Sequence, residues 1–175
     1  MIYYMSFSYL ENNQYGNART EDLWSALEQS SKEPVADILN NWVKKPGYPV
    51  IDAKLDYDHK KINLTLSQSR FLYDRLIDTN AHDMSTWKIP LSITGKGIEE
   101  NTSFLMESQC LRLPLPSNNS KAETAWVKIN DEQRGFYRVN YPPDQWAIMG
   151  EGIKSLELSP SNRLGLQDDA FALTQ

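Results

Sequence analysis

Residues 50–68 have the sequence VIDAKLDYDHKKINLTLSQ, which decides the fold class expected for this chain. Apolar residues occupy every second position from Ile51 to Tyr57, and charged residues stand between them. Such alternation is typical of a strand with one buried and one solvated face. Residues 58–60 predict a turn, and the alternation resumes from Ile62 to Leu66. The stretch therefore predicts a β-hairpin.

Five further short segments have strand character, with Asn, Ser, Gly and Pro residues between them: 87–93, 104–106, 110–113, 126–129 and 136–141. Pro90 indicates an edge strand or a position outside the hydrogen-bond ladder. Because no helical pattern intervenes, parallel crossover units are not expected. The sequence predicts a mainly β protein, a small antiparallel β-sandwich of about seven strands with α-helical segments at both ends.

Two short helices are predicted before the sandwich. Thr20 is the expected cap of the first, and Leu23, Ala26 and Leu27 form its apolar stripe. The second is expected to open at Pro34 and to end at Pro46 and Gly47. Its apolar face consists of Val35, Ile38, Leu39 and Trp42.

Helical signals return after Pro142 and Pro143. A weak stripe is formed by Trp146, Met149 and Ile153. Ser159 followed by Pro160 predicts a cap and the first turn of a second helix. Its expected inner face consists of Arg163, Leu166, Ala170 and Leu173. Apolar helix faces at both ends of the chain call for further packing partners.

Composition excludes several function classes. The 175 residues include 18 Lys and Arg against 23 Asp and Glu, which gives a net charge of −5. Nucleic-acid binding needs a basic footprint, and a membrane span needs roughly 20 apolar residues in a row; neither pattern is present. One Cys forms no internal disulfide, and two His with one Cys argue against an internal zinc cage. Residues 1–10 lack the basic start and cleavage site of a signal peptide and predict a buried helix or its tail.

The residues whose side chains could take part in a reaction do not form a recognisable catalytic motif. There is no HExxH and no GxSxG. We expect His59 and His82 to be solvated, Cys110 to be a buried inert thiol, and the acidic pairs Asp168-Asp169 and Glu99-Glu100 to lie at the surface. The glycine pairs at 95–97 and 150–152 are expected in turns, and most aromatic residues in the core, including Trp42, Tyr57, Trp87, Tyr137 and Tyr141. Glycosylation sequons begin at Asn63, Asn101 and Asn118 and do not decide the compartment.

Several short motifs, in this order, resemble the zinc aminopeptidases of the aminopeptidase N and puromycin-sensitive type. They are YGNA (15–18), TEDLW (20–24), NW (41–42), GYPV (47–50), LSQ (66–68), RF (70–71), WKIPL (87–91), WVKIN (126–130), GFYRVNY (135–141) and RLGLQDDAFAL (163–173). The last segment resembles the puromycin-sensitive, largely cytosolic branch. The similarity extends from about residue 9 to residue 175.

The resemblance implies three parts. Residues 1–46 would be the last helices of a catalytic domain, 47–141 a β-sandwich domain, and 142–175 the start of a C-terminal helical domain. The zinc motif, the loop for the substrate amino group and the catalytic tyrosine of that family would all precede the matched region. We therefore assign no catalytic, metal or substrate-binding residue, and expect zinc and peptide substrates only for the parent, cytoplasmic enzyme.

Two functions follow from this. The first is a fragment of an aminopeptidase that acts as a structural spacer between its other domains, which would be its partners, with no nucleic acid or membrane involved. The second is a free-standing β-sandwich module that binds a protein partner through its exposed helix faces.

Overall fold

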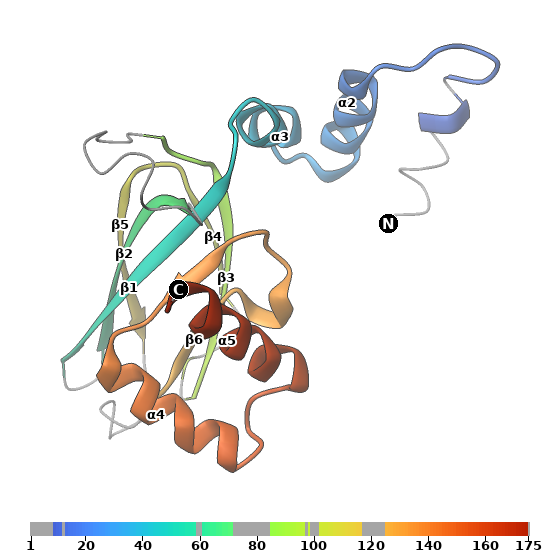
Figure 1. Ribbon diagram of the computed structural model, residues 1–175. Coiled ribbons are helices and arrows are strands. Elements are labelled where there is room, and N and C mark those ends of the chain that lie inside the picture. Colours follow the sequence, from blue (N-terminus) through green and yellow to red (C-terminus); the bar gives the residue numbers. More distant parts are fainter. Residues whose placement is uncertain are drawn as a thin grey trace. The chain divides into compact units, whose positions relative to one another are not determined.

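The computed structural model describes residues 9–11, 13–58, 61–71, 85–96, 98, 102–116 and 125–174. The chain divides into two compact units, Met1–Pro46 and Gly47–Gln175 (Figure 1). No described helix is long and apolar enough to cross a membrane. The helix expected over residues 1–10 lies almost wholly outside the described residues.

The N-terminal unit contains α2 (Thr20–Ser31) and α3 (Val35–Val43). The cap of α2 is Arg19 rather than Thr20: the Arg19 backbone N–H donates to Asp22 Oδ2 at 2.7 Å. Trp24, not Leu23, is the buried residue of α2, because the helix is rotated by one residue from the expected stripe. The Ala36 backbone N–H donates to Glu28 Oε2 at 3.0 Å, which joins the two helices.

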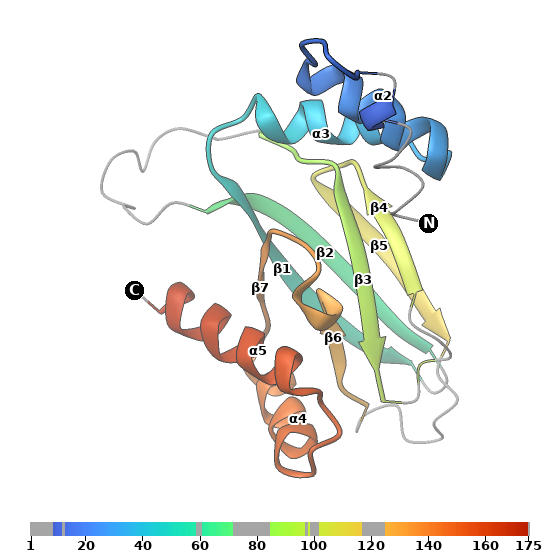
Figure 2. The same ribbon diagram turned by 90° about the vertical axis from the view of Figure 1, so that its right-hand side faces the viewer.

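The second unit is a sandwich of two sheets. Its strands are β1 (Tyr48–Asp58), β2 (Lys61–Phe71), β3 (Ile89–Gly95), β4 (Thr102–Met106), β5 (Cys110–Pro116), β6 (Val127–Ile129) and β7 (Arg138–Asn140). One sheet has the order β5-β2-β1-β7, and the other has the order β4-β3-β6. Figure 2 shows the two sheets as layers, with β6 and β7 at neighbouring edges. The seven-strand sandwich with helical flanks is thus confirmed.

The predicted hairpin is present as β1 and β2, paired from Tyr48↔Phe71 to Asp58↔Lys61. Alternate residues of both strands face the core, which includes Ile51, Leu55 and Leu64. One pair departs from the expected antiparallel pattern: β7 runs parallel to β1, with Val50 opposite Arg138. Strand β7 lies far from β1 in the sequence, so no local turn signal predicts that the two strands pair.

Pro90 lies in the ladder between β3 and β4, opposite Leu105, so it is not outside the ladder as one alternative expected. Its strand β3 is central, but β6 pairs only with residues from Ile93 to Gly95. At Pro90 the strand is therefore paired on the β4 side alone, opposite Leu105. A proline is tolerated here because only one edge of the strand carries ladder hydrogen bonds.

Two helices complete the second unit, α4 (Pro143–Lys154) and α5 (Pro160–Leu173). Ser159 caps α5 as expected, since its Oγ accepts from the Asn162 backbone N–H at 3.2 Å. The buried face of α5 differs from the predicted one by about one residue of rotation and consists of Asn162, Gly165, Leu166, Asp169 and Ala172. Two of these five residues are polar, which explains why an apolar stripe did not reveal this face.

Candidate functional site

The candidates singled out in the sequence do not converge in the described part of the molecule. His59, His82, Glu99-Glu100 and the sequons at Asn101 and Asn118 lie outside the described residues. Asn63 is exposed on β2. Cys110 is exposed at the start of β5, so its expected burial was wrong. Residues 150–152 lie inside α4 and not in a turn, while Gly95 ends β3.

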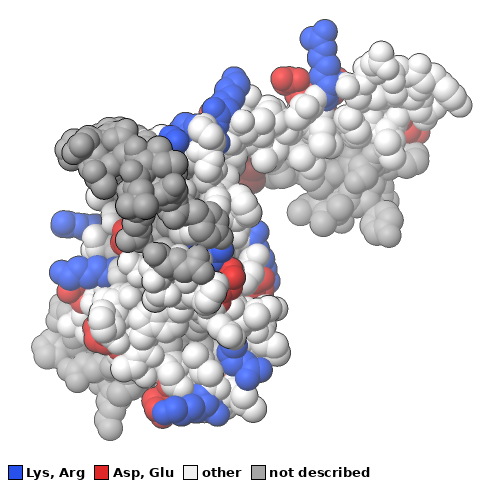
Figure 3. All heavy atoms as spheres, in the orientation of Figure 1, with Lys and Arg blue, Asp and Glu red and all other residues white. Residues whose placement is uncertain are grey.

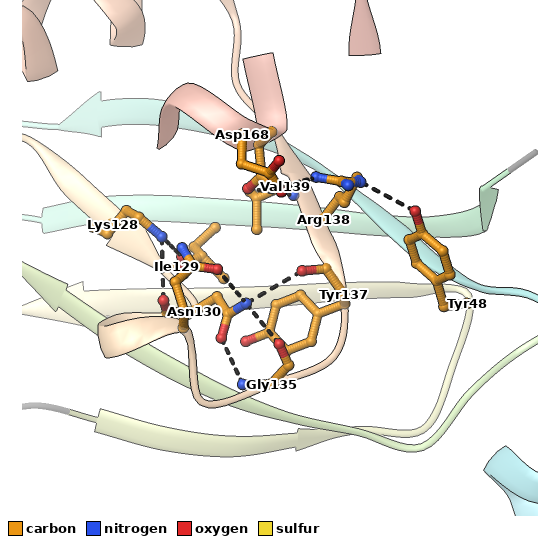
Figure 4. A network of polar contacts seen from close by, with 11 residues as sticks. Tyr48, Lys128, Ile129, Asn130, Gly135, Tyr137, Arg138, Val139 and Asp168 are labelled. Carbon is orange, nitrogen blue, oxygen red and sulfur yellow. Dashed lines mark hydrogen bonds and ion pairs between the residues drawn. The ribbon is translucent and has the colours of Figure 1, made fainter. Parts of the chain in front are cut away.

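The acidic pair Asp168-Asp169 requires the main correction. Asp168 is exposed as expected, but Asp169 retains only 3% of its accessible surface. Asp169 therefore points into the protein, toward the strands that α5 covers. Around it lies a network of buried and partly buried polar side chains from β1, β6, β7 and α5, part of which is drawn in Figure 4.

Arg138 on β7 connects three elements. Its Nε donates to Tyr48 Oη on β1 at 3.1 Å, and its Nη1 lies 2.6 Å from Asp168 Oδ2 and 3.3 Å from Asp169 Oδ1 on α5. The guanidinium also lies 5.4 Å from the centre of the Phe71 ring and 5.9 Å from that of Tyr48. Burial alone would lower the pKa of Arg138, but the hydrogen bonds and charge of Tyr48 and Asp168 raise it. The side chain thus stays charged and holds β1, β7 and α5 together.

Asp169 also binds the backbone. Its Oδ2 accepts the Val139 N–H at 3.2 Å, which satisfies a donor of the edge strand β7. Burial raises the pKa of Asp169 to about 6, although the Val139 N–H and the charges of Lys128 and Arg138 oppose the rise. A buried carboxylate with these partners is a structural acid that prefers its protonated form more than a solvated one does.

Lys128 on β6 is fully buried, which is rare for a lysine. Its Nζ donates to the backbone carbonyls of Ile129 at 2.5 Å and Asn130 at 3.2 Å. Burial lowers the pKa of Lys128 to about 8, and the nearby charges of Asp169, Asp131 and Glu132 limit the fall. The ammonium group therefore depends on acidic residues of α5 and of the loop after β6.

The loop between β6 and β7 is held in an unusual backbone conformation. Asn130, Glu132 and Gln133 all have positive φ, a region that residues other than glycine rarely adopt. The Asn130 side chain stabilises this loop, because its Nδ2 donates to the Gly135 carbonyl at 2.9 Å and its Oδ1 accepts the Gly135 N–H at 2.8 Å. Asn is among the residues that tolerate the left-handed region best.

The first turns of α5 fit against this loop. Asn162 Nδ2 donates to Asp131 Oδ1 at 3.0 Å, and Asn162 Oδ1 accepts the Glu132 backbone N–H at 2.9 Å. Gly165 is so close that a Cβ there would lie 1.5 Å from Gln133 Nε2. The helix and the strained loop therefore support each other.

A second contact joins α4 to the end of the sandwich. A Cβ at Gly152 would lie 2.8 Å from Nε1 of Trp126, which is buried. Trp126 Nε1 donates to Glu157 Oε2 at 3.1 Å, and Glu157 Oε1 accepts from Lys96 Nζ at 2.8 Å. The turn between α4 and α5 is thus fastened both to the segment before β6 and to the end of β3.

The contacts of this arrangement are those of a structural attachment between the helices and the sandwich. Its ionisable groups are bound to one another or to the backbone. Within the described ranges, no group of three or more His, Cys, Asp and Glu side chains could hold a metal ion. The site is best described as a polar joint, formed by Tyr48, Lys128, Asn130, Arg138, Asn162, Asp168 and Asp169. We call it the sandwich–helix joint.

Comparison with known proteins places the joint in a family context. Residues 126–175 match the model of the ERAP1-like C-terminal domain. Aminopeptidase M1 of Arabidopsis thaliana is 36% identical over 95% of this chain, and aminopeptidase M1-B of rice is 34% identical over the same share. Glutamyl aminopeptidase of the rat is 34% identical, also over 95% of the chain. The chain is related to a segment of these aminopeptidases.

The resemblance found in the sequence is thereby confirmed. The chain spans 19% of the length of the Arabidopsis aminopeptidase and 17% of that of the rat enzyme. The matched family model begins at Trp126, next to β6, and includes β7, α4 and α5. It therefore contains every residue of the sandwich–helix joint except Tyr48. The residue pattern alone did not predict this joint, although the motifs WVKIN, GFYRVNY and RLGLQDDAFAL contain five of its residues and GYPV contains Tyr48; Asn162 lies just before the last motif.

Proposed function

We propose that this chain is a structural connector within a zinc aminopeptidase, and that it has no catalytic centre of its own. The observation that carries this proposal is the sandwich–helix joint, in which Arg138, Asp168 and the buried Asp169 attach α5 to the sandwich. In some proteins, buried charges that are paired and hydrogen-bonded specify a defined arrangement of elements. The kinship with aminopeptidases supplies the context in which that arrangement matters.

The parent enzyme would remove N-terminal residues from peptides with the help of zinc. Zinc would polarise the scissile carbonyl and activate a water molecule. The described residues do not fit such an ion, and the sequence contains no HExxH motif. The metal and the reacting groups would therefore belong to another part of the parent, as would the choice of peptide. A cytoplasmic location is part of this proposal and rests on the branch resemblance alone.

Within the parent, residues 1–46 would close the catalytic domain, 47–141 would form the sandwich domain and 142–175 would open the C-terminal helical domain. The compact unit Gly47–Gln175 supports a close attachment of the last two. In this proposal the sandwich sets the angle between its neighbours, which would be its partners. Their position would define the space available to a peptide.

The proposal is tested with the purified 175-residue chain. We expect elemental analysis to find no stoichiometric zinc after dialysis, and we expect no release of chromophore from leucyl-anilide and glutamyl-anilide substrates. A glutamyl or alanyl aminopeptidase prepared in the same way serves as the positive control. One tightly held zinc per chain, together with turnover that a chelator abolishes, would refute the connector role.

A free-standing binding module is the second candidate. Leu164 and Phe171 on α5 keep 67% of their accessible surface each, which favours a protein contact on this helix. Analytical ultracentrifugation and pull-down with the tagged chain separate the two functions. A specific, saturable partner other than an aminopeptidase domain would support the module, and a monomer without such a partner would support the connector.

A further inference from the structure

The start of β1 and the C-terminal end of α5 lie together at one end of the sandwich. A small apolar cluster joins them, formed by Tyr48, Val50, Phe71, Ala172 and Leu173. The rings of Tyr48 and Phe71 are stacked, with centres 4.9 Å apart. The strand by which the chain enters the sandwich and the far end of its last helix are therefore neighbours in space.

Arg138 is the residue that spans this end. Through Nε it binds Tyr48 at the start of β1, and through Nη1 it binds Asp168 and Asp169 on α5. Figure 4 shows the guanidinium between the Tyr48 hydroxyl on one side and Asp168 on the other. Only 15% of its side-chain surface is accessible, so these contacts are partly shielded from water and salt.

We propose that Arg138 is a positioning residue, which fixes the direction in which β1 enters the sandwich relative to the axis of α5. The start of β1 and the C-terminal end of α5 would then be held together at one end of the sandwich. This inference rests on the proposed function only for its consequence in a parent enzyme. The coupling of β1 to α5 is a property of the 175-residue chain itself.

The chemistry of the site requires arginine. A planar guanidinium can donate to a hydroxyl and to two carboxylates while its face lies against aromatic rings. A lysine in its place keeps the positive charge but has a single compact ammonium group, which cannot reach Tyr48 and α5 in the same geometry. Arg138→Lys therefore tests whether the shape and contacts of the arginine side chain are needed in addition to its positive charge.

The test measures the distance between two spin labels by double electron–electron resonance. In a Cys110→Ser background, labels at Lys54→Cys on β1 and Gln167→Cys on α5 report the distance between the strand and the helix. Both positions are exposed. A control pair, Lys54→Cys and Ser103→Cys on β4, reports the spacing of the two sheets. Four versions are compared: the parent sequence, Arg138→Ala, Arg138→Lys and Arg112→Ala, an exposed arginine on β5.

We expect the β1–α5 distance distribution to broaden about twofold in Arg138→Ala, and to a lesser extent in Arg138→Lys, as local order is lost. The control pair should stay narrow in all versions, and Arg112→Ala should change neither distribution. A narrow β1–α5 distribution in folded Arg138→Ala would overturn the proposal, as would equal broadening of both pairs.

A milder variant decides the question if Arg138→Ala does not fold. Tyr48→Phe removes the hydroxyl that accepts from Arg138 and retains the ring. It should broaden the β1–α5 distribution alone, and an unchanged distribution in both Tyr48→Phe and Arg138→Lys would refute the role. These measurements need neither zinc nor peptide, so a failure here and a failure of the aminopeptidase proposal are distinct results.

Discussion

Gly150 and Gly152 offer a matched pair of substitutions on one helix. Both lie inside α4, two residues apart. A Cβ at Gly150 would meet nothing within 4 Å, whereas one at Gly152 would lie 2.8 Å from Nε1 and 3.0 Å from Cδ1 of the Trp126 ring. The two positions therefore have the same secondary structure but opposite tolerance for a methyl group.

The expected effects have opposite signs. Gly150→Ala should raise the free energy of unfolding by about 0.5–1 kcal/mol, because alanine loses less backbone entropy in a helix. Gly152→Ala has the same favourable entropy effect, but it also forces the buried indole of Trp126 to move. Such overpacking lowers the free energy of unfolding by about 1–3 kcal/mol. Moving Trp126 also strains its hydrogen bond to Glu157. The net effect should be a loss of about 1–2 kcal/mol.

Urea denaturation of the three proteins, followed by tryptophan fluorescence, measures these differences. A gap of about 2 kcal/mol between the variants corresponds to a separation of several degrees in Tm. Unchanged slopes in urea would show that only the folded state is affected. Equal stability of Gly150→Ala and Gly152→Ala would refute the view that α4 is seated on Trp126.

Three further predictions concern the sandwich–helix joint. The pKa of Asp169 in the folded protein, about 6, lies above the ordinary value for an aspartate. The stabilising contribution of this residue is therefore present below about pH 4 and is lost as the pH rises through 6. Relative to Asp169→Asn, the free energy of unfolding should fall by about 2–3 kcal/mol between pH 4 and 7.5, as measured by urea denaturation at each pH. Asn130→Ala should lower that free energy by about 2–4 kcal/mol, since it removes two hydrogen bonds to Gly135 and places alanine at positive φ, and Asn130→Gly should lower it less. Gly165→Ala should change Tm by less than about 3 °C, because the exposed Gln133 side chain can swing away and the helix gains propensity; a loss as large as that of Gly152→Ala would contradict this reasoning.

The strands were predictable because each carries its own signal. The alternation in β1 and β2 reflects a sheet with one wet face, and short segments with strand character and turn residues between them mark the other strands. The parallel partner of β1 was not predictable in this way. Strand β7 is only three residues long and pairs with residues far along the chain, so neither period nor turn chemistry specifies its direction.

The joint itself escaped prediction because a helix face was misjudged by one residue. A search for apolar residues selected Arg163, Leu166, Ala170 and Leu173, whereas the buried face contains an amide, a glycine and a carboxylate. Asn162 and Asp169 are buried because each has a hydrogen-bond partner on another element, Asp131 and the Val139 N–H respectively. Gly165 is buried because the Gln133 side chain lies against it. Partners on other elements do not appear in the period of a single helix.

Two residues in the motifs that carry the family resemblance, Asn130 and Arg138, occupy positions where few other residues fit. Position 130 needs a side chain that tolerates positive φ and can bond back to Gly135. Arg138 must be planar, charged and long enough to reach both Tyr48 and α5. Core positions accept several apolar residues of similar volume. The short motifs indicated the family, and in our proposal none of them belongs to a catalytic site.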